Sequence, residues 1–401
     1  MRKRVLAVLF GTLLIDMIGV GMIFPILPAI FTDASSPYFM LAGYSVDMQY
    51  FMAGALTAIF SVMQFIMAPI LGELSDVFGR KKLLALGIAV FAVSQLVFGF
   101  AIAIMSLPLL FISRAISGLG AANFSIAQAA IADVTPPEER AKNFGLIGAA
   151  FGIGFILGPL LGGIISDWSA SATAPFWVAG ALGIVNLLFV TWFLPETRKV
   201  SAKERHHFDI WRGLHNIRSA VKDKDARPVY IANFLSQSGF AFFTSFIGIL
   251  LVVRFGLTPA GVGAFFAVVG IWVVITQGVI LRFVVEKYSD RKVLKWALVI
   301  LALSSAVYAF LPNILSLYAV MPLVAIGQGL IIATVTALIS KGVSEEKQGV
   351  ALGINGSILA LSNGVGPILA GVGSGLLGLS APFLIGGFLI LVAWWVVVRM
   401  R

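Results

Sequence analysis

Cysteine is absent from this chain, which excludes disulfide bonds, thiolate metal sites and catalysis by a thiol. No GxxxxGKS or GxxxxGKT segment occurs, so a phosphate-binding loop for ATP hydrolysis is excluded as well. Charge is scarce, since Asp, Glu, Lys and Arg make up only 11% of the 401 residues, whereas 59% are hydrophobic. So little polar surface cannot cover a soluble globule of this length. The composition therefore predicts a membrane-embedded protein, and we expect no metal and no cofactor.

Long apolar runs occupy most of the sequence. A membrane-spanning helix needs roughly 20 predominantly apolar residues, and runs of this kind recur between short polar connections. The runs are continuous and do not alternate with a period of two residues, so they do not fit a β-barrel. We predict an all-α membrane protein with twelve transmembrane helices. Their expected ranges are 5–30, 47–71, 83–104, 108–133, 143–165, 175–194, 229–253, 259–281, 296–311, 315–340, 349–375 and 381–398.

The distribution of basic residues predicts how the chain crosses the membrane. All of the 28 Lys and Arg residues except Arg114 and Arg254 fall before the first run, after the last one or in every second connection. Connections rich in Lys and Arg remain in the cytoplasm. We therefore expect both termini and the central connection to be cytoplasmic. The net charge of +10 is attributed to topology, and nucleic-acid binding is not expected.

The segment 195–228 is the only sizeable polar stretch, and it divides the chain near its middle. We predict a bundle of six helices over 1–194, a cytoplasmic linker over 195–228 and a second bundle over 229–401. The linker contains all three histidines, His206, His207 and His215. We interpret it as a solvated, partly helical connection, and a metal-binding or regulatory role of the histidines is the alternative.

Three landmarks recur at nearly the same spacing in both halves. The pairs Asp76 and Glu286, Gly118 and Gly327, and Pro159 and Pro367 are separated by 210, 209 and 208 residues. Such an internal repeat predicts two pseudo-symmetric six-helix bundles. Transporters built in this way place their substrate near the midplane between the halves.

Several segments carry a resemblance to one family. GELSDVFGRKK from Gly72, LLFISRAISGLGAA from Leu109 and GIGFILGPLLGG from Gly152 resemble the signatures of the second connection, fourth helix and fifth helix of the major facilitator superfamily. The third is typical of its drug:proton antiporter branch. DMIGVGMIFPILP from Asp16 and IADVTPPEERAKNFG from Ile131 are similar to twelve-helix tetracycline and multidrug efflux proteins. The resemblance implies the major facilitator fold, export from a cell and a bacterial cytoplasmic (inner) membrane.

The first of these segments predicts a conformational latch. Gly72 and Gly79 permit a tight turn, and the resemblance implies that Asp76 meets the amino end of the eleventh helix in an outward-facing state. It also implies that Arg80 pairs with Asp133 and that this pair breaks on inward opening. The alternative is that the charges here only fix the topology.

The fifth-helix segment predicts a close contact between the halves. Gly154, Gly158 and Gly162 are spaced at i, i+4 and i+8 and form one stripe of small residues, and Gly163 belongs to the same motif. Pro159 bends the helix beside this stripe. Ordinary packing of helices within one bundle is the alternative.

Two charges lie inside the predicted membrane spans. Asp16 is about 11 residues, roughly 16 Å, from the cytoplasmic end of its run, and Arg114 is roughly 9 Å from the opposite surface. Charges at such depths are costly, so they usually mark a pathway or have a partner. We predict that Asp16 and Arg114 share a cavity and couple transport to protons, with a purely structural ion pair as the alternative.

Amide and aromatic side chains are the candidate substrate contacts. The runs of the second half contain no Asp, Glu, Lys or His, so amides supply much of their polarity. Such a set suits a lipophilic compound of moderate polarity, although packing between helices explains any single amide equally well. The candidates are Asn123, Gln237, Phe240, Gln277, Gln328 and Asn355.

The function expected from these features is proton-coupled efflux of an amphiphilic drug-like compound by alternating access. The partners expected are this small molecule, protons and the lipid bilayer, and the protein is expected to be a monomer. A proton-coupled metabolite transporter is the alternative. A membrane enzyme or a non-transporting receptor is the remote alternative, because no cluster of catalytic residues at one depth is present.

Overall fold

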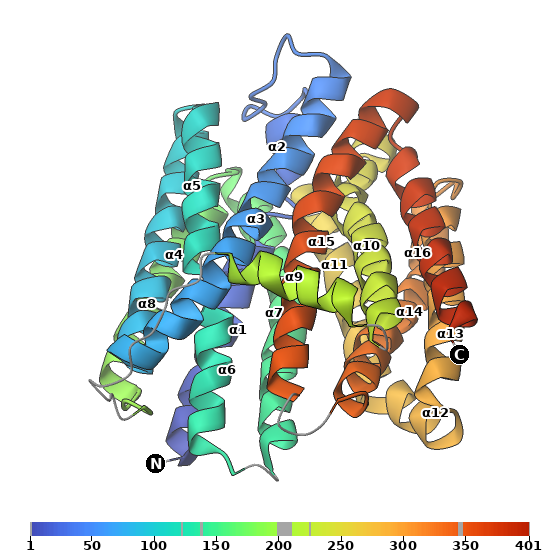
Figure 1. Cartoon of the computed structure of the whole chain (residues 1–401). Coiled ribbons are helices and arrows are strands. Elements are labelled where there is room, and N and C mark those ends of the chain that lie inside the picture. Colours follow the sequence, from blue (N-terminus) through green and yellow to red (C-terminus); the bar gives the residue numbers. More distant parts are fainter. Residues whose placement is uncertain are drawn as a thin grey trace.

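The computed structural model is a bundle of long helices (Figure 1). It describes residues 2–121, 123–136, 139–198, 211–223, 226–343 and 348–400. The first half contains α1 (Arg2–Gly21), α2 (Leu27–Phe31), α3 (Val46–Phe78), α4 (Arg80–Ala103), α5 (Leu107–Gly120), α6 (Asn123–Val134), α7 (Arg140–Ser169) and α8 (Ala174–Phe193). A short helix follows, α9 (Arg212–Lys222). The second half contains α10 (Arg227–Phe255), α11 (Pro259–Ile275), the π-helical turn η2 (Thr276–Ile280), α12 (Leu281–Lys287), α13 (Asp290–Val307), α14 (Ile314–Lys341), α15 (Gln348–Leu377) and α16 (Ala381–Arg399).

The number of spanning helices agrees with the predicted fold class. Of the described residues, 11 helical segments are long and apolar enough to cross a membrane. The predicted run 296–311 corresponds to α13, which misses that criterion because Asp290, Arg291, Lys292 and Lys295 lie in its first two turns. Since α13 packs against α14 and α16 within the second half, it completes that set.

The first predicted helix is interrupted. The run 5–30 ends as a regular helix at Gly21 and resumes as α2 at Leu27. Pro25 lies in the interruption, where its missing N–H and its ring oppose helical hydrogen bonding. The run 108–133 corresponds to α5 and α6, which together form one span over Leu107–Val134. In contrast, α3 continues seven residues past its predicted end, to Phe78.

The helices pack as two sets. Helices α1 to α8 contact one another extensively, as do α10 to α16, and the main contacts between the sets join α3 to α15 and α7 to α11. The division into 1–194, 195–228 and 229–401 stays a prediction. We call the end of the molecule where α1 begins and α16 ends the basic face, and the end where α3 begins the opposite face (Figure 1).

Near the opposite face the two sets touch through glycine. A Cβ added to Gly54 would lie 2.2 Å from the carbonyl oxygen of Pro367, and one added to Gly371 would lie 2.6 Å from that of Tyr50. The α7 and α11 pair repeats the pattern, since a Cβ on Gly263 would lie 2.4 Å from the carbonyl oxygen of Pro159. These close approaches require residues without a side chain.

Toward the basic face the described glycines of these helices make no such contacts. Gly145 and Gly148 on α7, Gly278 after α11, and Gly353 and Gly356 on α15 have open space at the position of a Cβ. Each of these glycines lies on the same side of its helix as the residues that contact the other set nearer the opposite face. The two sets are therefore closed at the opposite face and apart toward the basic face.

Candidate functional site

Asp16 lies in a cradle of amides inside the first set of helices. Its side chain is 5% exposed. The Asn123 Nδ2 atom on α6 donates to Asp16 Oδ2 at 2.8 Å, and the Asn186 Nδ2 atom on α8 donates to Asp16 Oδ1 at 3.3 Å. Within the described part of the chain, no Lys, Arg or His forms an ion pair with Asp16. The carboxylate is thus held by neutral donors.

The cradle also contains acceptors that have no donor. Asn123 Oδ1, Asn186 Oδ1 and Thr12 Oγ1 are buried and make no hydrogen bond in the structure. A neutral carboxyl has one O–H to donate, whereas a carboxylate only accepts. The cradle therefore presents donors for a charged Asp16 and acceptors for a neutral one.

Arg114 lies apart from this cradle. Its side chain is 4% exposed, its Cζ atom lies 4.4 Å from the centre of the Phe60 ring on α3, and its Nε atom has no hydrogen-bond partner. Among the described residues no ion pair joins Arg114 to Asp16, so the purely structural pair that was the alternative is not formed. That the two residues share a cavity and couple transport to protons stays a prediction.

The residues of the predicted latch come together at the basic face. Arg80 is 4% exposed and donates from Nε to Asp133 Oδ2 at 3.1 Å and from Nη2 to Asp76 Oδ1 at 2.5 Å. Its Nη1 atom donates to the Ser75 hydroxyl at 2.6 Å and to the Gly72 carbonyl at 3.4 Å. The guanidinium thereby joins the end of α3, the start of α4 and the end of α6.

The predicted Arg80–Asp133 pair of this latch is formed. Both partners belong to the first set of helices, so moving the two sets apart does not by itself stretch the contact. That the pair breaks on inward opening stays a prediction. The meeting of Asp76 with the eleventh spanning helix stays a prediction for the other state.

The residues just after α8 were missed by the sequence analysis. The Glu196 carboxylate accepts from the backbone N–H groups of Arg80 at 2.9 Å and Lys81 at 3.2 Å, so it caps α4. Thr197 donates to Asp133, and Arg198 pairs with Asp76 at 3.3 Å. A run of polar residues directly after the last apolar run of the first half was the available signal. Asn186, an amide inside an apolar run, was a second one.

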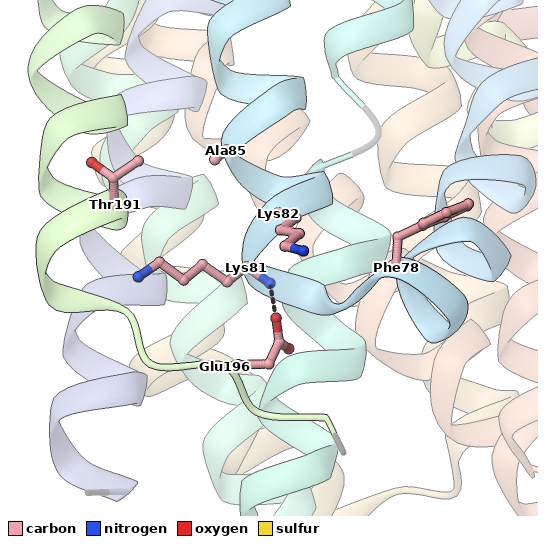
Figure 2. Close-up of a pocket in the computed structure, with 6 residues that line it drawn as sticks. All are labelled: Phe78, Lys81, Lys82, Ala85, Thr191 and Glu196. Carbon is pink, nitrogen blue, oxygen red and sulfur yellow. Dashed lines mark hydrogen bonds between the residues drawn. The ribbon is translucent and has the colours of Figure 1, made fainter. Parts of the chain in front are cut away.

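A surface cavity of about 460 Å³ lies beside this cap (Figure 2). Figure 2 shows the Glu196 carboxylate beneath the backbone nitrogen of Lys81, while the Lys81 side chain extends away from it. The lining residues are Phe78, Lys81, Lys82, Ala85, Thr191 and Glu196. All belong to the first set or to the residues just after it, so this cavity is not the space between the sets.

The glycines of the predicted antiporter segment divide between two partners. Gly154, Gly158 and Gly162 pack on α1 and the turn after it, where added Cβ atoms would lie 2.3 to 2.7 Å from atoms of Met17, Ile18 and Met22. Gly163 instead faces the second set, since its Cβ would lie 2.2 Å from the carbonyl oxygen of Pro259. The predicted i, i+4, i+8 stripe thus packs within the first set, and its neighbour makes the contact between sets.

The amides of the second set bond to one another. Gln328 Nε2 on α14 donates to Gln237 Oε1 on α10 at 2.8 Å, and Asn233 Nδ2 on α10 donates to Asn355 Oδ1 on α15 at 2.7 Å. Gln328 Oε1 and Asn233 Oδ1 remain buried without a partner. Each pair therefore bridges two helices and keeps one unused acceptor.

The other candidate contacts are dispersed. Phe240 stacks on Phe243, with ring centres 6.1 Å apart. Gln277 lines a second cavity of about 450 Å³, at the basic face of the second set, beside the Lys341–Asp290 ion pair. Asn123 belongs to the Asp16 cradle. The structure therefore does not gather the six candidates around one space, and among the described residues no group of His, Asp and Glu forms a metal site.

Known proteins resemble this chain over nearly its whole length. Multidrug resistance protein 2 of Bacillus subtilis (strain 168) is 27% identical over 98% of this chain and 94% of its own length. The class H tetracycline resistance protein of Pasteurella multocida is 28% identical over 92% of this chain and 88% of its own. The crystal structure of the human organic anion transporter MFSD10 (TETRAN) superposes with a TM-score of 0.74, covers 99% of both chains and is 24% identical, which supports the fold.

The family assignment rests on a broader match. The model of the major facilitator superfamily matches residues 9–354 and 229–401, which together take in nearly the whole chain. The two sets of helices and the duplicated landmarks agree with that match. The chain therefore belongs to the major facilitator superfamily of secondary transporters.

Proposed function

We propose that this protein exports amphiphilic, drug-like compounds in exchange for protons, by alternating access between its two sets of helices. The substrate class is inferred from the relatives named for multidrug and tetracycline resistance, at 27% and 28% identity. We assign the basic face and both termini to the cytoplasm of a bacterial inner membrane, because Lys and Arg concentrate there. A monomer suffices for this mechanism.

The observation that carries the proposal is the Asp16 cradle. Coupling requires a group that gains a proton on one side of the membrane and loses it on the other. Asp16 has two amide donors for its charged form and three unpartnered acceptors nearby for its neutral form. Rotation of either amide would bring an acceptor to a protonated Asp16. Both protonation states thus have hydrogen-bond partners without a permanent counter-ion.

The contacts between the sets support alternating access. Near the opposite face they include backbone-to-glycine packing, and aromatic side chains such as Phe155 and Phe266 also meet across the two sets. Under the proposed orientation this arrangement opens to the cytoplasm. The stripes of α7, α11 and α15 continue toward the basic face with small residues, so the same helices can close there when the sets rock.

The proposal is tested in everted membrane vesicles that contain the protein. Tetracycline, a quinolone and a cationic dye are the probes, and the lumen is acidified before each is added. We expect at least one probe to accumulate in the lumen and to dissipate the proton gradient as it enters. Accumulation that survives collapse of the gradient contradicts proton coupling. Movement in the other direction, or of metabolites alone, supports the metabolite transporter instead.

A further inference from the structure

The helix α9 is attached to both sets of helices. It lies across α3 and α15 in Figure 1 and contacts both of them. On the α3 side, Arg212 forms an ion pair with Glu73, and Gly213 packs so closely on Phe65 that an added Cβ would lie 2.7 Å from the ring. On the α15 side, Asn216 Nδ2 donates to Ser357 Oγ at 3.0 Å. One face of α9 is thus fixed against the protein.

These contacts place α9 beside the spanning helices and not beneath them. Phe65 lies about 20 Å of helix before the end of α3 at Phe78. Ser357 lies about 10 Å of helix inside the span that begins at Val350. Both partners belong to segments that are long and apolar enough to cross a membrane. The outer face of α9 is therefore at the depth of the lipid leaflet at the basic face.

The outer face of α9 combines apolar and cationic side chains. Trp211, Leu214 and Val221 are 64%, 49% and 55% exposed and share one side of the helix. Arg218 and Lys222 are exposed on the same side, and the sequence Arg212–Lys222 contains no Asp or Glu. An apolar stripe next to cations suits a helix that lies in the membrane interface. Cations in that position attract anionic headgroups.

We propose that the outer face of α9, formed by Trp211, Leu214, Arg218, Val221 and Lys222, binds anionic phospholipids of the leaflet at the basic face. The apolar side chains enter the acyl region, and Arg218 and Lys222 meet the headgroup phosphates. The inner face joins α3 to α15 at the same level. Lipid bound on the outer face therefore holds a helix that bridges the two sets.

The test uses the purified full-length protein in phosphatidylcholine vesicles that contain lipids with brominated acyl chains, which quench tryptophan on contact. Trp211 is isolated by subtracting the signal of Trp211→Phe from that of the wild type. We expect brominated phosphatidylglycerol to quench Trp211 at a mole fraction roughly tenfold lower than brominated phosphatidylcholine. Arg218→Gln together with Lys222→Gln should remove this preference.

Trp168 provides the matched control, because it is 90% exposed at the opposite face and follows Asp167. The quenching of Trp168 is isolated by subtracting the signal of Trp168→Phe from that of the wild type. Brominated phosphatidylglycerol and brominated phosphatidylcholine should quench Trp168 at the same mole fraction. Raising the salt concentration should weaken the preference at Trp211 in the unaltered protein, which tests the charge without any substitution. Equal quenching of Trp211 by both lipids, or a preference that survives the double substitution, overturns the proposal. Absence of quenching shows that the face meets water or a protein partner and overturns it as well.

Discussion

Asp16 is the residue on which proton coupling depends. Asp16→Asn keeps the size of the side chain and can still bond with Asn123 and Asn186, so the protein should fold and insert. The variant cannot exchange a proton, and we expect it to lose uphill export while retaining downhill exchange of substrate. Transport in vesicles with and without a proton gradient measures both. Asp33→Asn, in the loop after α2, is the control, and wild-type uphill rates in Asp16→Asn contradict the role.

The Gln237–Gln328 pair allows packing and substrate contact to be separated. Gln328→Leu leaves Gln237 Oε1 buried without its donor, which should cost about 1 to 3 kcal/mol of stability. Gln237→Leu with Gln328→Leu removes both groups, so most of that loss should be recovered in thermal unfolding. We expect the double variant to change the ratio of resistances to different compounds. An unchanged ratio assigns the pair to packing alone.

The sequence identified individual residues where the residue type is rare inside a membrane. The buried charges were found because an Asp or Arg in an apolar run is conspicuous, but their partners were not. Asp16 is held by Asn186, and Arg114 lies on Phe60. Phe60 does not stand out in a sequence that contains 32 Phe residues. Asn186 is an amide in an apolar run, but the sequence does not show that it faces Asp16, because contacts between distant helices depend on how those helices rotate.

Gly79 controls the turn between α3 and α4. It has φ +95°, and a Cβ there would lie 2.5 Å from Glu196 Oε2. Gly43 is a matched control, because it has φ +85° but open space around its Cβ position. Positive φ costs about 1 to 3 kcal/mol in both alanine variants. Gly79→Ala should lose more stability in thermal unfolding than Gly43→Ala, since it also displaces Glu196, which caps α4. Equal losses of stability in the two variants contradict that role of Glu196.

Element boundaries followed from the sequence only where the chain itself sets them. The apolar runs placed the spanning helices because their length is fixed by the bilayer. They did not show that α1 stops at Gly21 or that α3 reaches Phe78. The first depends on local turns around Pro25, and the second on the buried Arg80 network, which supports polar residues beyond the apolar run.

The contacts between the sets predict that a glycine substitution near the opposite face changes the structure, whereas one toward the basic face does not. Gly54→Ala places a Cβ against the backbone of Pro367, so it should open the structure at the opposite face. Gly353→Ala meets open space and should leave the present arrangement unchanged. Because the chain has no cysteine, paired spin labels can be introduced on α3 and α15 to measure both ends. A similar distance change in both variants contradicts alternating closure.

The two-set architecture was the most predictable property of the whole molecule. The repeated landmarks Pro159 and Pro367 and the basic connections indicated it without any structural information. Which end of the molecule is closed was not predictable. Glycine stripes run along both contact surfaces, and the sequence is the same in every state of the transport cycle.

The π-helical turn η2 joins α11 to α12 and holds one residue more than an ordinary α-helical turn would hold at the same place. Deleting a single residue between Thr276 and Ile280 would convert this turn to ordinary α-helix and leave the hydrogen bonds on either side intact. Elsewhere in a regular spanning helix, a deletion rotates everything downstream by about 100°. This segment is therefore a site of tolerated length change, where a chain one residue shorter can keep the same helix.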